Sequence, residues 1–94
     1  MLIVTITHPV EDYTWWRAGF DGFEGARRAS GTKFERVPQD VNDPNLISVV
    51  MGFDTREQAD AFLGLPELKE AMAGAGVTAP PEFRFMNEVG RFDY

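Results

Sequence analysis

The chain has 94 residues and a net charge of −6. A chain of this length forms one small domain, which we place at residues 1–94. It contains no cysteine, which excludes disulfides and thiolate metal sites. The negative charge argues against nucleic-acid binding, because phosphates attract basic surfaces.

The sequence also bears on membranes, metals and location. It has no run of about 18 apolar residues, so no membrane-spanning helix is predicted. Residues 1–8 (MLIVTITH) lack the basic start of a signal peptide, and we therefore expect a cytoplasmic protein. His8 is the single histidine, and one histidine without cysteine argues against a transition-metal site. We predict no metal and no cofactor.

The first two predicted elements are a strand and a helix. Residues 2–8 (LIVTITH) are mostly β-branched and apolar, which is typical of a strand. Residues 10–29 carry aromatic side chains at helical spacing, which predicts a helix with one apolar face. The aromatic residues on that face are Tyr13, Trp16, Phe20 and Phe23.

The middle of the chain predicts a hairpin. Residues 32–37 (TKFERV) and 46–53 (LISVVMGF) have strand composition. The segment between them, QDVNDPN at 39–45, is rich in turn-forming residues. We therefore expect two neighbouring strands joined by this turn.

A second helix and a last strand complete the pattern. TREQ at 55–58 is a capping box that begins the helix. Pro66 lacks a backbone donor and should bend or restart that helix. Pro80 and Pro81 exclude helix and lead into a strand at 82–89 (EFRFMNEV).

The predicted order is β-α-β-β-α-β. With right-handed crossovers, this order gives a four-stranded antiparallel sheet with both helices on one face. We therefore predict an α+β, ferredoxin-like fold. RNA-recognition domains share this topology, but they need aromatic residues on the first and third strands, and 2–8 has none.

The central strands are apolar on both faces. In the third strand, Ile47 and Val49 point to one face, while Leu46 and Val50 point to the other. Two helices can cover only one of these faces. The simplest cover for the other is the sheet of a second copy, so we predict a homodimer that pairs through this face. The alternative is a half-polar face that stays exposed.

A paired sheet face has a consequence for Arg84, which lies on the predicted outer face. Burial in a dimer would require an acidic partner for its guanidinium. The candidates are Glu35 and Glu88.

Four segments carry a resemblance to a known family. They are EDYTWWRAGFD at 11–21, NDPN at 42–45, LPELKEAMAGAGV at 65–77 and PPEFRFMNEV at 80–89. Together they make the chain similar to the dimeric α/β-barrel superfamily, which includes antibiotic-biosynthesis-type monooxygenases and small polyketide cyclases. The nearest pattern is that of a small bacterial branch of unknown function, from which Trp15 departs because a small residue is expected there.

The resemblance implies a ferredoxin-like subunit, a dimer and a small-molecule pocket between helices and sheet. It implies no catalytic set that transfers residue by residue. If the chain is an enzyme, the resemblance suggests cofactor-independent oxygenation or cyclisation of a hydrophobic or aromatic metabolite.

The aromatic residues of the first helix have two interpretations. Trp16 and Phe20 either fill the core or line such a pocket, for which aromatic walls are well suited. Trp15 lies about 100° around the helix from Trp16 and should pack on a loop, a partner or a ligand. We name Trp15, Trp16 and Phe20 as candidate pocket residues.

His8 is the candidate acid–base residue. Its pKa near neutrality suits proton transfer, and it ends the first predicted strand on the same face as Val4 and Ile6. The alternative is a histidine that only hydrogen-bonds the start of the helix. The corresponding functional alternative is a non-catalytic structural or regulatory dimer with a filled core.

Overall fold

The computed structural model describes residues 1–94 and has the predicted ferredoxin-like arrangement. Its four strands form one antiparallel sheet in the order β2-β3-β1-β4. The strands are β1 (Leu2–Pro9), β2 (Phe34–Arg36), β3 (Leu46–Phe53) and β4 (Glu82–Asn87). The helices are α1 (Tyr13–Gly22), α2 (Glu24–Ala29), α3 (Arg56–Leu63) and α4 (Pro66–Gly74).

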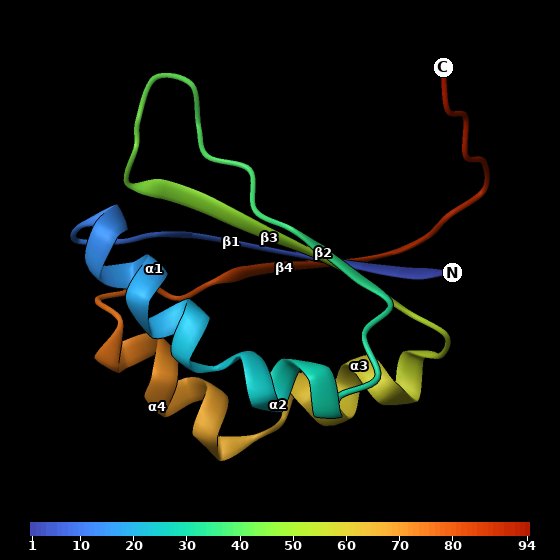
Figure 1. Cartoon of the computed structure of the whole chain (residues 1–94), viewed down its shortest axis with the longest axis horizontal. Coiled ribbons are helices and arrows are strands. Elements are labelled where there is room, and N and C mark those ends of the chain that lie inside the picture. Colours follow the sequence, from blue (N-terminus) through green and yellow to red (C-terminus); the bar gives the residue numbers. More distant parts are fainter.

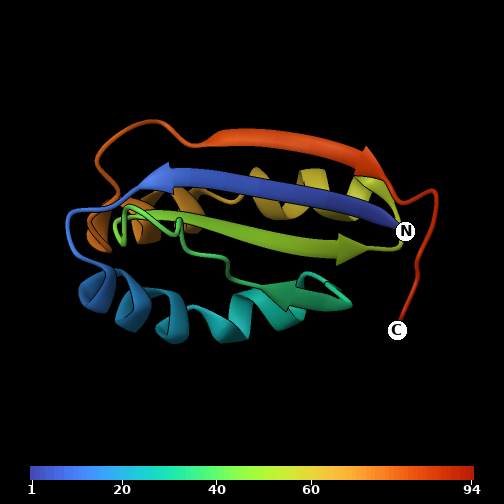
Figure 2. The ribbon, with the colours of Figure 1, turned by 90° about the horizontal axis from the view of Figure 1, so that it is seen from above.

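All four helices lie on one face of the sheet (Figure 1). Viewed from above, the strands lie side by side over the helix layer (Figure 2). The loop before β3 and the C-terminal residues run on the opposite side of the sheet (Figure 1). No helix covers that second face. None of the helices has the length and apolar character needed to cross a membrane.

The register divides the sheet into an inner face toward the helices and an outer face. Val4 of β1 pairs with Met51 of β3 and with Phe85 of β4, so these side chains share the inner face. The next residue, Thr5, pairs with Val50 and Arg84 on the outer face. The buried core lies between the inner face and the helices. Its strand residues are Val4, Ile6, Ile47, Val49, Met51 and Phe53. Val10 just after β1 and Ala75 just after α4 also belong to it, and the helices contribute Trp16, Ala59, Phe62 and Leu68.

The first helical segment differs from the single helix predicted at 10–29. Asp12 caps α1 by accepting a hydrogen bond from the backbone N–H of Trp15, so the helix begins at Tyr13. It ends at Gly22, and Phe23 leaves the helical region with φ −94° and ψ 8°. Glycine lowers helix stability by about 1 kcal/mol relative to alanine, which makes a break here inexpensive. The break turns Phe23 toward Phe62 of α3, with ring centroids 6.4 Å apart.

The second helical segment restarts at Pro66, as predicted. α3 ends at Leu63, and Pro66 occupies the first turn of α4, where the missing proline N–H has no helical partner to lose. The predicted capping box is present as well. The Thr55 hydroxyl accepts from the Gln58 backbone N–H at 3.2 Å, and the Gln58 side-chain oxygen Oε1 accepts from the Thr55 backbone N–H at 3.4 Å.

On the outer face, one of the two acidic partners predicted for Arg84 in a dimer is excluded, and the other, Glu88, stays a prediction. Within one chain its guanidinium pairs with Glu82, 3.1 Å away. Glu35 is unavailable because it points to the helix side and pairs with Arg27. The reason is alternation: Phe34 and Arg36 face outward beside Gly52 and Val50, so Glu35 between them faces inward.

Candidate functional site

A cavity of about 50 Å³ lies between the helix layer and the inner face of the sheet. Fourteen residues line it, and eleven of them are hydrophobic. The exceptions are Gly19, His8 and Arg27. The cavity is therefore an apolar space with two polar side chains on its wall.

One wall of the cavity is a continuous row of rings that begins at His8. The His8 and Trp16 ring centroids are 5.8 Å apart, and Trp16 stacks on Phe20 at 4.9 Å with an interplanar angle of 26°. At the other end, the guanidinium carbon of Arg27 lies 3.6 Å from the centroid of Phe20. The structure thus brings the predicted residues His8, Trp16 and Phe20 together on the cavity wall.

His8 reaches the cavity because it alternates with Val4 and Ile6 along the inward face of β1. It is 3% exposed, and its Nδ1 is buried without a hydrogen-bond partner. Burial lowers the pKa of His8 below its ordinary value of 6.5. The weaker, opposite influence of the histidine's own backbone does not cancel this shift. The resting side chain is therefore a neutral imidazole at neutral pH.

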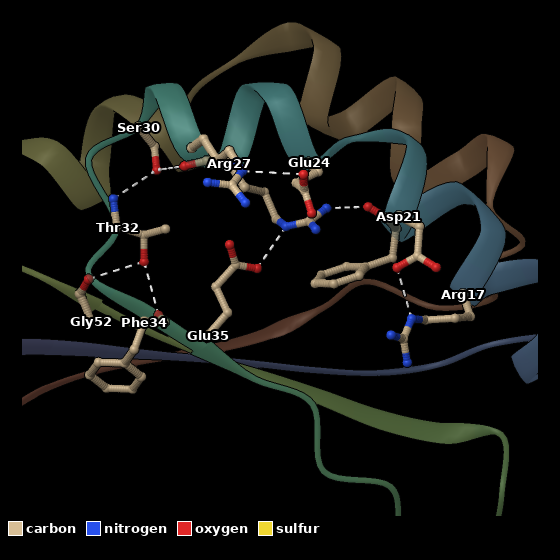
Figure 3. A network of polar contacts seen from close by, with 11 residues as sticks. Arg17, Asp21, Glu24, Arg27, Ser30, Thr32, Phe34, Glu35 and Gly52 are labelled. Atoms are coloured by element: carbon tan, nitrogen blue, oxygen red, sulfur yellow. Dashed lines mark hydrogen bonds and ion pairs between the residues drawn. The ribbon is translucent and has the colours of Figure 1, made fainter.

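Arg27 is the site residue that sequence reasoning missed. It is 6% exposed and lies on α2, where its Nε donates to Glu35 Oε2 at 2.6 Å. Its Nη1 donates to the backbone carbonyl of Phe20. Figure 3 shows the side chain reaching from α2 toward Glu35 on β2.

A signal for Arg27 exists in the sequence. Position 27 follows Phe23 by four residues, so it continues the aromatic stripe of the first helical segment. A charged residue on an apolar stripe is buried only with a partner, and that partner comes from a different element. The sequence shows the stripe, whereas the pairing with Glu35 depends on how α2 meets β2.

Trp15 lies outside the cavity wall and is 48% exposed. Its ring packs on Gly76, where an added Cβ would come within 3.0 Å of the ring carbons. Gly76 has a φ of +82°, a conformation that glycine adopts without strain. Trp15 thus rests on the turn after α4, and a contact with a ligand stays a prediction.

A second, polar groove lies on the far side of Arg27, between α2 and the start of β2. It measures about 320 Å³, and Arg27 and Glu35 belong to its wall. The other lining residues are Glu24, Arg28, Thr32, Lys33 and Phe34. Figure 3 shows the polar network of this region, in which Thr32 bonds the backbone carbonyls of Phe34 and Gly52. Arg27 therefore separates an apolar cavity from a polar groove.

No group of three or more histidine, cysteine, aspartate or glutamate side chains is placed to hold a metal ion. The polar contacts of the site come instead from one imidazole, one guanidinium and one carboxylate. This set can transfer a proton and can bind an anion.

No family model matches the chain, and no curated protein matches it in sequence. Solved structures do match it over nearly the whole length. A Deinococcus radiodurans protein assigned to the antibiotic biosynthesis monooxygenases is 18% identical, with a TM-score of 0.78, over 100% of this chain and 98% of that one.

Two Streptomyces structures give the same result. SnoaB of Streptomyces nogalater, a cofactor-independent oxygenase, has a TM-score of 0.81 at 9% identity over 99% of this chain and 97% of its own. The ActVA-Orf6 monooxygenase of Streptomyces coelicolor, solved with nanaomycin D, has a TM-score of 0.74 at 17% identity, covering 99% and 91%. Sequence identities this low show a shared fold and nothing more. The chain has the fold of these structures, and the predicted ferredoxin-like fold is confirmed.

Proposed function

We propose that the chain is a homodimeric α/β-barrel protein that binds a small aromatic metabolite in the cavity and oxygenates it without a bound cofactor. One observation carries this proposal. A buried, neutral histidine with an unpaired Nδ1 stands on the wall of an aromatic-lined cavity. A buried polar atom without a partner is rare in folded proteins and calls for an explanation, and a ligand group is one.

The residues on the cavity wall are suited to the proposed oxygenation. Neutral His8 can accept a proton from an acidic C–H or O–H of an electron-rich substrate. The resulting anion is a reductant for dioxygen, and apolar walls keep water from quenching it. For an activated methylene the balance is R₂CH₂ + O₂ → R₂C=O + H₂O. One oxygen atom enters the product and the other leaves as water, while the substrate supplies all four electrons.

The size of the cavity sets a condition on binding. Its volume of about 50 Å³ is below the roughly 150 Å³ that holds benzene in an engineered apolar cavity. A larger ligand requires rotation of half-buried wall residues, and Phe20, Phe23 and Met72 are the wall residues of that kind. The small volume also favours the second candidate function, a non-catalytic dimer with a filled core.

The structural neighbours support the first candidate. SnoaB is described as a cofactor-independent oxygenase, and ActVA-Orf6 was solved with nanaomycin D. A shared fold supplies the same layer of space between helices and sheet, although the residues that line it differ at these identities.

The dimer is supported by the bare outer face of the sheet. Ile3, Thr5, Thr7 and Val50 are only partly exposed there, although no helix covers them. Thr7 and Ser48 form a hydrogen bond of 2.8 Å on this face, which uses one of their two hydroxyl donors. Val89, Phe92 and Tyr94, whose tail runs on the same side of the sheet, are at least 77% exposed (Figure 1). A second copy would cover these groups.

Ligand binding is tested with the two tryptophans as separate reporters. In the Trp15→Phe variant, all indole emission comes from Trp16 on the cavity wall. Nanaomycin D should quench this emission in a saturable way. In the matched Trp16→Phe variant, the half-exposed Trp15 should respond weakly. Equal quenching in both variants, or none in either, would contradict a ligand in the cavity.

Turnover is tested with anthrone, whose methylene lies between two aromatic rings. Wild-type protein should accelerate oxygen uptake and anthraquinone formation over the buffer rate. His8→Gln should lose at least about 100-fold of this acceleration, since general-base catalysis contributes about that much or more. Val41→Gln introduces the same side chain at a position that is 94% exposed and should keep full activity. Saturable binding without any turnover would favour the non-catalytic alternative.

A further inference from the structure

We propose that Arg27 makes the cavity selective for aromatic ligands that carry an anionic oxygen, a carboxylate or a phenolate, at the end remote from His8. This inference rests on the proposed function, because it requires the cavity to admit a ligand. It names the class of ligand, which neither the fold nor the row of aromatic rings specifies.

Arg27 has donors to spare. A guanidinium carries five N–H groups. The protein accepts from two of them, through Glu35 on Nε and the Phe20 carbonyl on Nη1. The structure gives no protein acceptor for the other three, which include both on Nη2, although Arg27 is only 6% exposed. These nitrogens are not sealed from solvent, so an anionic oxygen can replace water as their hydrogen-bond partner.

The position of Arg27 fixes where that oxygen would lie. Its guanidinium stacks on the face of Phe20, and Phe20 stacks on Trp16, which contacts His8. A flat ligand along this row would meet a proton acceptor at one end and a cation at the other. The two polar residues thus orient an aromatic acid in one direction, with its reactive carbon at His8.

Glu35 holds Arg27 in place and does not block it. The Glu35 carboxylate accepts from Nε and makes no hydrogen bond to Nη2, so the Nη2 donors stay without a protein acceptor. A buried guanidinium that already has one carboxylate is costly to move, so its direction is set before a ligand arrives. Glu35 is therefore a positioning residue for Arg27.

The polar groove beyond Arg27 adds to the attraction. Arg28 pairs with Glu24 at 3.2 Å and Lys33 with Asp54 at 3.3 Å, and all four side chains are more than half exposed. Exposed ion pairs of this kind contribute little to stability, so they exchange partners easily. Either cation can turn toward a negative group that Arg27 holds.

The competing explanation is that Arg27 only ties α2 to β2. A purely structural role would affect stability but would not distinguish ligands of equal shape and different charge. The test therefore compares 2-naphthoate with 2-naphthamide, which differ in charge and hardly in size. Titrations at about pH 8, where 2-naphthoate is ionised, follow the two tryptophan indole N–H signals of ¹⁵N-labelled protein by NMR.

In the wild type, both probes should shift the Trp16 signal, and 2-naphthoate should bind at least about tenfold more tightly. Arg27→Met should abolish this preference and leave the affinity for 2-naphthamide unchanged. Arg27→Lys, which keeps the charge, should retain part of the preference. Arg91→Met, a change at a 66% exposed position that lines neither the cavity nor the polar groove, should keep all of it. The same spectra show whether each variant is folded.

The outcomes separate the two proposals. If both probes bind the wild type equally, or if Arg27→Met keeps the preference, the role of Arg27 is wrong while the cavity stands. If neither probe shifts the Trp16 signal, the ligand-binding function itself is wrong, and this inference falls with it.

Discussion

Gly19 of α1 faces Ala75 after α4 so closely that a Cβ added to Gly19 would lie 2.8 Å from the Ala75 Cβ. Both residues line the cavity. The missing side chain therefore sets how closely the two helices approach at this wall. It also keeps the cavity open beside Trp16 and Phe20.

We expect Gly19→Ala to lower the free energy of unfolding. Overpacking costs about 1–3 kcal/mol, which outweighs a gain of up to about 1 kcal/mol in helix propensity. Gly22→Ala is the matched control in the same helix, because its Cβ would meet nothing within 4 Å. Gly22→Ala should be neutral or stabilising. Urea unfolding of both variants checks this, and equal effects would contradict a close contact between α1 and α4.

The free energy of unfolding should depend on pH through His8. The unfolded chain titrates this residue near 6.5, whereas burial lowers its pKa in the folded state. Between the two values the unfolded state binds more protons, so stability falls as the pH is lowered. The contribution of neutral His8 is fully present above about pH 6.5 and is lost as the pH falls through the lower, folded-state pKa.

His8→Gln isolates this contribution, because glutamine does not titrate. Urea unfolding of both proteins between about pH 5 and 8 should show a stability difference that changes with pH. The wild type should lose stability relative to the variant toward the acid side. A difference that is constant over this range would show that folding does not perturb the pKa of His8.

Val50→Lys should prevent dimer formation. Val50 lies at the centre of the outer face, between Thr5 of β1 and Arg36 of β2. A lysine there would bring cations together across a two-fold interface and bury them without partners. Native mass spectrometry of the wild type should give a dimer and of the variant a monomer. Ala61→Lys, at an exposed site of α3 on the opposite, helix-covered face, should remain dimeric. A monomeric wild type would contradict the proposed dimeric barrel.

Gly52 and Phe34 should show strong energetic coupling. A Cβ on Gly52 would lie 2.2 Å from a ring carbon of Phe34, so Gly52→Ala must displace that ring. We expect a loss of about 1–3 kcal/mol in unfolding free energy for Gly52→Ala. The same change in a Phe34→Ala background should cost much less, because the clash is gone. Additive losses in the double variant would show that the two residues do not touch.

Much of the fold can be predicted from the sequence, because each element depends on residues that are close together in the chain. The strand at 46–53, the capping box at 55–58 and the restart at Pro66 each follow from residue chemistry within a few positions. The chain order of strands and helices then leaves few topologies, and the inward position of His8 follows from simple alternation. The break at Phe23 is not predicted, because Gly22 only makes a break inexpensive and the Phe23–Phe62 contact that accompanies it joins residues distant in sequence.

The sequence by itself determined the ferredoxin-like order, the apolar stripe of the first helical segment and the absence of thiol chemistry. Only the tertiary structure decided that Trp16 and Phe20 line a cavity while Trp15 rests on Gly76. The ion pair between Arg27 and Glu35 is also visible only in the tertiary structure. The physical reason is that periodicity assigns a side chain to a face, whereas a cavity or an ion pair depends on distances of an ångström or two between elements that the sequence keeps apart.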